Sequence, residues 1–151
     1  MAFIPADARW YLADLILEYA IQDEPRNVVH VNLHLIEADS PEAAYEKAMA
    51  LGQAAQYNYQ NTDGKLVRVS FRGLRDLNVI HDGVEDEAEL IYEESFGVPE
   101  ETLGNWVKER DQLGVFLPMA PCKGSPNYMP AEIWSILRDL SHRCDELPKG
   151  E

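Results

Sequence analysis

Hydrophobic and polar residues alternate along residues 10–19 and again along residues 28–37. Because successive side chains of a strand point to opposite faces, this period of two predicts two half-buried β-strands. The second stretch is the clearer one. It has an aliphatic face and a polar face, formed by Val29, Val31, Leu33 and Leu35 and by His30, Asn32 and His34, respectively.

The first stretch also has an interpretation as a helix. A helix that begins after Pro5 would bring Trp10, Ala13 and Leu17 onto one face. The alternation favours a strand, and the polar residues 22–27 that follow suit a hairpin connection.

An alanine-rich helix is predicted to follow the second strand. Ser40 suits the N-cap position, and Pro41 suits the first helical position, where the missing N–H of proline costs nothing. The helix is expected to end near Gln56. Small or aliphatic residues recur at helical spacing and predict the stripe that faces a sheet: Ala44, Ala48, Leu51 and Ala55. We expect this stripe to bury four strand residues: Val31, Leu33, Val69 and Phe71.

Two more strands are predicted after the turn at Asp63-Gly64. Residues 66–80 would span roughly 50 Å when extended, which is too long for one flat strand of a small sheet. Gly73 is therefore expected to mark a bend or bulge. Residues 89–96, in which Leu90, Tyr92 and Phe96 alternate with mainly polar neighbours, predict the fourth strand.

These elements predict an α+β fold for residues 1–98. The expected architecture is an antiparallel sheet of about four strands in the order strand-strand-helix-strand-strand, with one helix on the apolar face. Residues 99–151 are assigned to a helical, proline-punctuated extension that packs on this domain or on a second copy. A short amphipathic helix is expected from about Leu103 to Arg110. A longer one is expected after Pro130, with one apolar side: Ile133, Trp134, Leu137, Leu140 and Cys144.

The chain is strongly acidic, with 27 acidic and 13 basic side chains and a formal charge of −14. This charge argues against nucleic acid and anionic membrane as partners. Seven carboxylates lie between Asp82 and Glu94 without a lysine or arginine. One interpretation is a solvated segment that keeps the protein soluble. The other is a docking surface for a basic protein, to which Glu85, Asp86 and Glu87 contribute.

No catalytic residue, metal site or cofactor motif is recognised in the sequence. His30 and His34 would lie about 13 Å apart along an extended strand, too far for both to bind one ion at about 2.1 Å. Trp106 and Trp134 are expected to be core or interface anchors, and the interface interpretation makes them partner-binding residues.

Two arginines on the polar side of the third strand leave two interpretations open. Arg68 and Arg72 are expected to form cross-strand ion pairs with Glu89 and Glu93. Alternatively, a shared face would combine the arginines with three polar residues of the second strand. That surface would suit an anion or a carboxylate-bearing peptide, and its candidate ligand-binding residues are His30, Asn32, His34, Arg68 and Arg72.

Location and oligomeric state are expected from simple features. No apolar run approaches the roughly 20 residues of a membrane span, and residues 1–7 lack the parts of a signal peptide, so the cytoplasm is expected. Cys122 and Cys144 are expected to be reduced thiols, although a disulfide between them stays open. Open sheet edges and the apolar C-terminal side chains predict a homodimer.

Several segments in combination resemble the bacterial domain of unknown function 4288. They are Trp10-Tyr11, residues 35–44, Lys47-Ala48, Tyr59, Asn61, Asp63-Gly64, Val67, residues 71–76 and residues 89–92. The resemblance extends over about residues 10–96 and leaves residues 97–151 outside. It implies the strand-strand-helix-strand-strand order and a strand at Trp10, and it implies no activity.

The charge, the small size and the missing catalytic constellation favour a non-catalytic interaction or regulatory protein. An inhibitor or immunity-type protein for a basic partner is one such protein. The alternative is a small enzyme or an anion-binding or small-ligand-binding protein that uses the polar sheet face. A concave pocket would favour the alternative.

Overall fold

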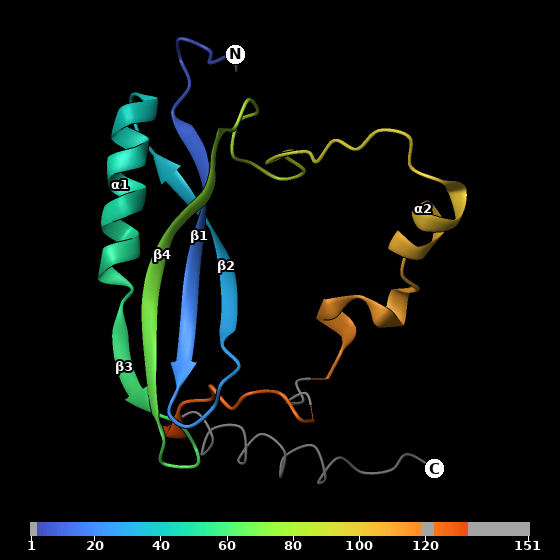
Figure 1. Cartoon of the computed structure of the whole chain (residues 1–151). Helices are drawn as coiled ribbons and strands as arrows, with labels where there is room; N and C mark the ends of the chain where they lie inside the picture. Colours follow the sequence, from blue (N-terminus) through green and yellow to red (C-terminus); the bar gives the residue numbers. More distant parts are fainter. Residues whose placement is uncertain (1–2, 119–122, 133–151) are drawn as a thin grey trace, which may run out of the picture. The chain divides into compact units, whose positions relative to one another are not determined.

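The computed structural model describes residues 3–118 and 123–132. In this part of the chain an antiparallel sheet has the spatial order β2-β1-β4-β3, and helix α1 packs on it (Figure 1). The predicted α+β class and the β-β-α-β-β order are confirmed. In chain order the elements are β1 (Trp10–Ile21), β2 (Val28–Glu37), α1 (Pro41–Ala54), β3 (Tyr57–Gln60), β4 (Leu66–Val79), α2 (Glu100–Trp106), and the short 3-10 helices η1 (Arg110–Gln112) and η2 (Gly114–Phe116).

The described residues divide into two compact units. The first, here named the sheet unit, contains residues 3–91 and 126–132, and the second contains residues 92–118 and 123–125 with α2, η1 and η2. The sheet unit thus includes a C-terminal segment that the sequence assigned to the extension. α2 overlaps the predicted short amphipathic helix. The longer predicted helix beyond Pro130 lies outside the described residues.

The strand predicted at residues 89–96 is wrong. The sheet has its fourth strand earlier in the chain, as β3. Residues 81–99 contain no strand, whereas β3 pairs with the start of β4 across a tight turn. Asn61 closes this turn, because its Oδ1 accepts hydrogen bonds from the backbone N–H of Asp63 (3.0 Å) and of Lys65 (2.9 Å). Closing so short a loop costs little chain entropy, so the local hairpin takes this edge of β4.

Register decides which face of the sheet α1 covers. The buried cluster under α1 contains Tyr11 and Leu15 of β1, and these residues pair directly with Ile36 and Asn32 of β2. Directly paired residues share a face of the sheet. The polar side of β2 therefore lies on the α1 side, and its aliphatic side lies on the opposite face, here named the open face.

The expected burial of Val31 and Leu33 under α1 is wrong. Both belong to the open face, and the Leu33 residue is 55% exposed. Val69 is buried on the α1 side as expected, and Phe71 packs against the same side. β2 is an edge strand, and its register follows the apolar side chains of the central strand β1 rather than its own pattern.

The buried side of α1 is made of small residues: Ala44, Ala48 and Gly52. Leu51 does not belong to this stripe, since it is 37% exposed, and that part of the prediction is wrong. A Cβ atom at position 52 would lie 2.4 Å from the Phe71 ring, so glycine lets the end of α1 rest on β4 without displacing that ring. Ser40 caps the helix as predicted, because its Oγ accepts the N–H of Ala43 (3.1 Å).

β4 bends at two bulges, and the predicted bulge at Gly73 is confirmed. The pairing of β4 with β1 skips Arg75 and then Arg72, the residues on either side of Leu74 and Gly73. Gly73 has a φ of 127°, which an L side chain rarely adopts. The bend lets this long strand pair with β1 and β3 in one small sheet.

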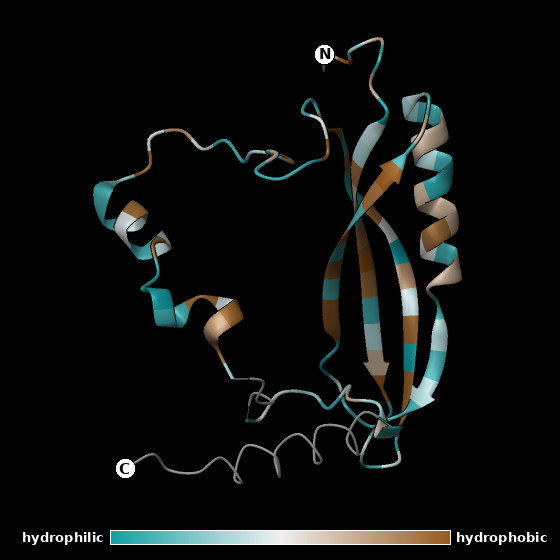
Figure 2. Cartoon of the chain, turned by 180° about the vertical axis from the view of Figure 1, so that it is seen from behind, coloured by the Kyte–Doolittle hydropathy of each residue, from teal (hydrophilic) through white to brown (hydrophobic). Residues whose placement is uncertain are grey.

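Hydrophobic residues are concentrated along the strands of the sheet (Figure 2). A second apolar cluster lies on the α1 side of the sheet: Leu17, Tyr19, Ile21, Val67 and Val69. Residues 126–130, here named the strap, pack on this cluster through Tyr128. The strap is attached by backbone contacts, because the Thr62 N–H donates to the carbonyl of Met129 (3.2 Å) and Asn61 forms a β-bridge with Pro130.

Candidate functional site

The five candidate ligand-binding residues do not come together. His30, Asn32 and His34 lie on the α1 side of the sheet, whereas Arg68 and Arg72 lie on the open face. The sheet separates the two groups, so a ligand on one face cannot contact all five. The shared polar surface considered from the sequence is therefore absent from the described part of the chain.

His30 belongs to an aromatic cluster at the strap. Its ring centroid lies 4.7 Å from that of Tyr19 and 5.1 Å from that of Tyr128, and the Tyr128 contact is edge-to-face. The hydroxyl of Tyr59 donates a hydrogen bond to the backbone carbonyl of Tyr128. The contacts of His30 thus join β1 and β2 to the strap.

Burial favours the neutral form of two tyrosines at the strap, Tyr19 and Tyr59, by raising their pKa values. It raises the pKa of Tyr59 far above its usual value, and the neighbouring Tyr57, Tyr19 and Tyr128 add to the rise. Burial, and then Tyr57 and Tyr128, raise the pKa of Tyr19 as well. Because the folded pKa values exceed the unfolded value of about 10, the stability that these phenols contribute is complete below that pH. It is lost as the pH rises through the raised values.

Two ion pairs between β1 and β4 lie on the open face. The Asp14 side chain is 9% exposed, and its Oδ2 accepts hydrogen bonds from Arg75 Nε (3.0 Å) and Nη2 (2.7 Å). Glu18 accepts a hydrogen bond from Asn27 Nδ2 (2.6 Å), and its other carboxylate oxygen lies 3.9 Å from Arg72. Arg72 thus approaches Glu18 rather than the expected carboxylates at positions 89 and 93, because those positions form no strand beside β4.

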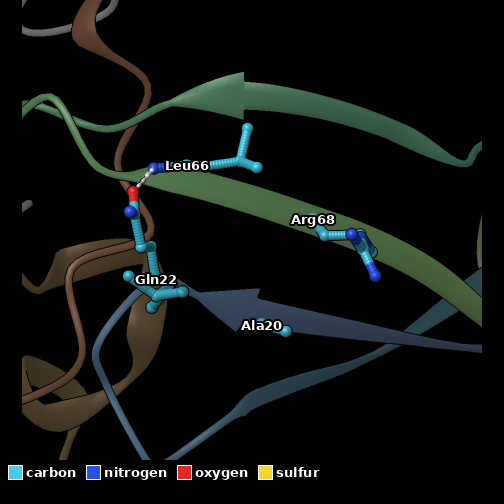
Figure 3. A pocket seen from close by; sticks show the side chains of 5 residues that line it. Ala20, Gln22, Leu66 and Arg68 are labelled. Carbon is cyan, nitrogen blue, oxygen red and sulfur yellow. Dashed lines mark hydrogen bonds between the residues drawn. The ribbon is translucent and has the colours of Figure 1, made fainter.

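A small hollow of about 200 Å³ lies at the end of β1 and the start of β4 (Figure 3). Its lining consists of Ala20, Ile21, Gln22, Leu66 and Arg68. The Leu66 N–H donates to Gln22 Oε1 (3.2 Å), which ties the loop after β1 to β4. Arg68 supplies the charge of this lining, so the hollow suits a carboxylate or another small anion.

All seven carboxylates between Asp82 and Glu94 are exposed. Five of them belong to the sheet unit and lie in residues 82–89, here named the acidic loop: Asp82, Glu85, Asp86, Glu87 and Glu89. The loop is closed by Asp82 Oδ2, which accepts the N–H of Glu89 (3.3 Å). The Ala88 N–H donates to the Glu85 carbonyl (3.2 Å) within it. The carboxylates are therefore presented on a folded loop.

Aromatic and aliphatic side chains are also exposed in the second unit. Trp106 ends α2 and is 58% exposed, and Val115 is 84% exposed. The other tryptophan of interest, Trp134, lies outside the described residues. The structure thus leaves Trp106 accessible as a candidate partner-binding residue.

Sequence reasoning missed the contact between Asp14 and Arg75 and the contact between Tyr128 and the sheet. The first had a detectable signal, since a carboxylate in the middle of an apolar strand requires a partner. Tyr128 had none, because a strap that returns to the sheet from a distant part of the chain leaves no periodic pattern.

Within residues 3–118 and 123–132, no three His, Cys, Asp or Glu side chains come close enough to hold a metal ion. None of the helices in that part of the chain is long and apolar enough to cross a membrane.

Comparison with known proteins gives one match. A family model described as a domain of unknown function (DUF4288) matches residues 10–92. No curated protein and no solved structure matches the chain. The matched residues include the four strands of the sheet, α1 and the acidic loop.

Proposed function

The chain belongs to the DUF4288 family of domains of unknown function, and we propose that it is a non-catalytic interaction protein of the cytoplasm whose acidic loop binds a basic protein. An inhibitor or an immunity-type protein fits this description. The observation that supports the proposal is the concentration of exposed carboxylates in residues 82–89 of a chain with a formal charge of −14.

The carboxylates of the acidic loop are available to a partner. Among the described residues, none of them forms an ion pair with a lysine, arginine or histidine. Like charges held together on one loop produce a negative potential that attracts a basic surface and accelerates its association. Surface charges are screened beyond about 8 Å at physiological salt, so binding should weaken as the salt concentration rises.

The test compares three forms of the chain as baits in a bacterial lysate. They are the unchanged protein, the loop variant E85Q/D86N/E87Q, and a control variant with the same charge change on exposed residues beside and on α1, D39N/E42Q/E46Q. We expect the unchanged protein and the control to retain a basic protein that salt elutes and that mass spectrometry identifies. The loop variant should lose it.

Association rates of the recovered protein complete the test. The loop variant should bind the recovered protein with an association rate constant at least about 10-fold lower at low salt, and that rate constant should depend less on the salt concentration. Retention of the same proteins by all three baits, with equal on-rates, would show that the acidic loop is only a solvated surface.

A second candidate function is the binding of a small anion or carboxylate in the hollow at Arg68. In the described part of the chain Arg68 has no ion pair, and the hollow beside it has apolar walls. Amide NMR shifts of Gln22 and Leu66 during titration with acetate and phosphate test this candidate. Shifts that saturate, and that disappear in Arg68→Gln, would support it, whereas shifts that persist in Arg68→Gln would exclude it.

A further inference from the structure

The outer edge of β2 exposes a regular row of backbone donors and acceptors. β2 is at one edge of the sheet. The Ala38 N–H donates to the Arg9 carbonyl and the Ile80 N–H donates to the Trp10 carbonyl, both at 2.9 Å. Bonding directions alternate along an antiparallel strand, so the even-numbered residues of β2 bond to β1. The odd-numbered residues from Val29 to Leu35 point their N–H and carbonyl groups outward, and the row ends at Glu37, whose carbonyl accepts a hydrogen bond from Lys47 Nζ (2.6 Å).

The same odd-numbered residues place apolar side chains on the open face. Val29 is 51% exposed, Leu33 is 55% exposed and Leu35 is 45% exposed. Residues 28–36 contain no charged residue, no proline and no glycine. Edge strands of monomers are usually protected by lysine, proline, a bulge or short length, and this strand has none of these features. Its backbone and side chains both suit another strand.

We propose that β2 pairs with β2 of a second copy of this chain, antiparallel about a two-fold axis at Asn32. In this register Val31 lies opposite Leu33 of the partner subunit, and Val29 lies opposite Leu35 of the partner subunit, as hydrogen-bonded pairs. His30 lies opposite His34 of the partner subunit as a non-hydrogen-bonded pair. The two sheets then form one continuous sheet across the axis.

Charge and side-chain pattern favour a second copy as the occupant of this edge. Each chain has a formal charge of −14, so two copies approach best through an uncharged surface, and residues 28–36 are uncharged. In the proposed register aliphatic residues meet aliphatic residues on the open face, and polar residues meet polar residues on the α1 side. A shift by two residues in one direction would place Glu37 opposite Val29 of the partner subunit, and in the other direction it would place Leu35 opposite Asn27 of the partner subunit, so either shift loses part of this match. The inference concerns a surface other than the acidic loop and does not depend on it.

Light scattering over about 1 to 100 µM protein tests the dimer, since these concentrations bracket ordinary dimer affinities. We expect a mass of twice 17.1 kDa that falls on dilution. Leu33→Lys should raise the dissociation constant by at least about 30-fold, because it places a charge in each half of the interface. Tyr45→Lys is the control, because it also replaces an exposed large side chain, on α1, and should leave the mass unchanged. Thermal melts by circular dichroism confirm that both variants are folded.

Cross-linking tests the register itself, in a chain with Cys122→Ser and Cys144→Ser. Two copies of Asn32→Cys would lie opposite each other with Cα atoms about 4.5 Å apart, a separation that a disulfide spans. Oxidation should therefore yield a covalent dimer from Asn32→Cys and none from Leu33→Cys. A mass of 17.1 kDa at every concentration would overturn the proposal. A dimer that withstands Leu33→Lys, or cross-links through Leu33→Cys alone, would overturn this interface or this register.

Discussion

Asp14 lies in the central strand β1, and its nearly buried carboxylate forms an ion pair with Arg75. Arg75→Met keeps much of the aliphatic stem but leaves the carboxylate without its charged donor. We expect the free energy of unfolding to fall by about 1–3 kcal/mol. Arg72→Met is the matched control, because Arg72 is exposed and 3.9 Å from Glu18, and its loss should change stability by no more than about 0.5 kcal/mol. Denaturant melts measure both values, and equal losses would contradict the assignment.

Glu24 is a residue whose partner shifts its pKa. Hydrogen bonds from the side chain and the backbone N–H of Arg26 lower the pKa of Glu24 to about 2. The folded pKa lies below the unfolded one, so the stabilising effect is complete above the unfolded pKa and is lost as the pH falls through about 2. An NMR titration should show this low midpoint, and Arg26→Gln should move it up towards an ordinary glutamate. An unchanged midpoint in the variant would assign the shift to another cause.

At the scale of single elements, the end of α1 depends on the absence of a side chain at Gly52. Gly→Ala in a helix is usually stabilising by about 1 kcal/mol. Gly52→Ala should instead destabilise the chain by about 1–3 kcal/mol, because its Cβ would meet the Phe71 ring at 2.4 Å. Gly104→Ala in α2 is the control, since no atom lies within 4 Å of a Cβ there. In a double-mutant cycle with Phe71→Leu, the penalty should shrink, and an additive cycle would argue against the contact.

The strap is the second element whose contribution can be measured. Tyr128→Ala should lower the free energy of unfolding by about 2–4 kcal/mol, because the side chain packs on the buried Leu17 and Val67 cluster. Val115→Ala is the control, since Val115 is 84% exposed and its truncation should cost no more than about 0.5 kcal/mol. Thermal melts compare the two variants. A Tyr128→Ala protein as stable as the parent would exclude the strap from the core.

At the scale of the whole molecule, the formal charge of −14 opposes compactness through self-repulsion. Raising the sodium chloride concentration from about 0.02 to about 0.3 M should therefore raise the melting temperature at pH 7, since screening shortens the reach of these charges. Tetramethylammonium chloride should act in the same way if screening is the cause. A melting temperature that does not rise in either salt would mean that ion pairs offset the repulsion.

Local patterns in the sequence determine most of the fold without reference to any tertiary contact. The alternation around Leu15 and around Val69 predicted β1 and β4, because a period of two follows from the geometry of a single strand. Ser40 and Pro41 marked the start of α1, because a helix N-terminus needs a side-chain acceptor and tolerates proline. Gly73 marked the bulge, since its backbone conformation suits only glycine. Each of these signals acts within a few residues.

Tertiary structure decided the rest, because each remaining choice depends on residues far apart in the chain. The face of β2 that meets α1 follows from its register with β1, and a shift of one residue would exchange Val31 and Asn32. The candidate ligand-binding residues were divided between two faces for the same reason. The strap is held on the sheet by contacts with residues more than sixty positions earlier in the sequence, among them the hydrogen bonds of Tyr128 with Tyr59 and of Asn127 with Asn61. Such contacts form only after the sheet exists to receive them, so no pattern in the strap itself predicts them.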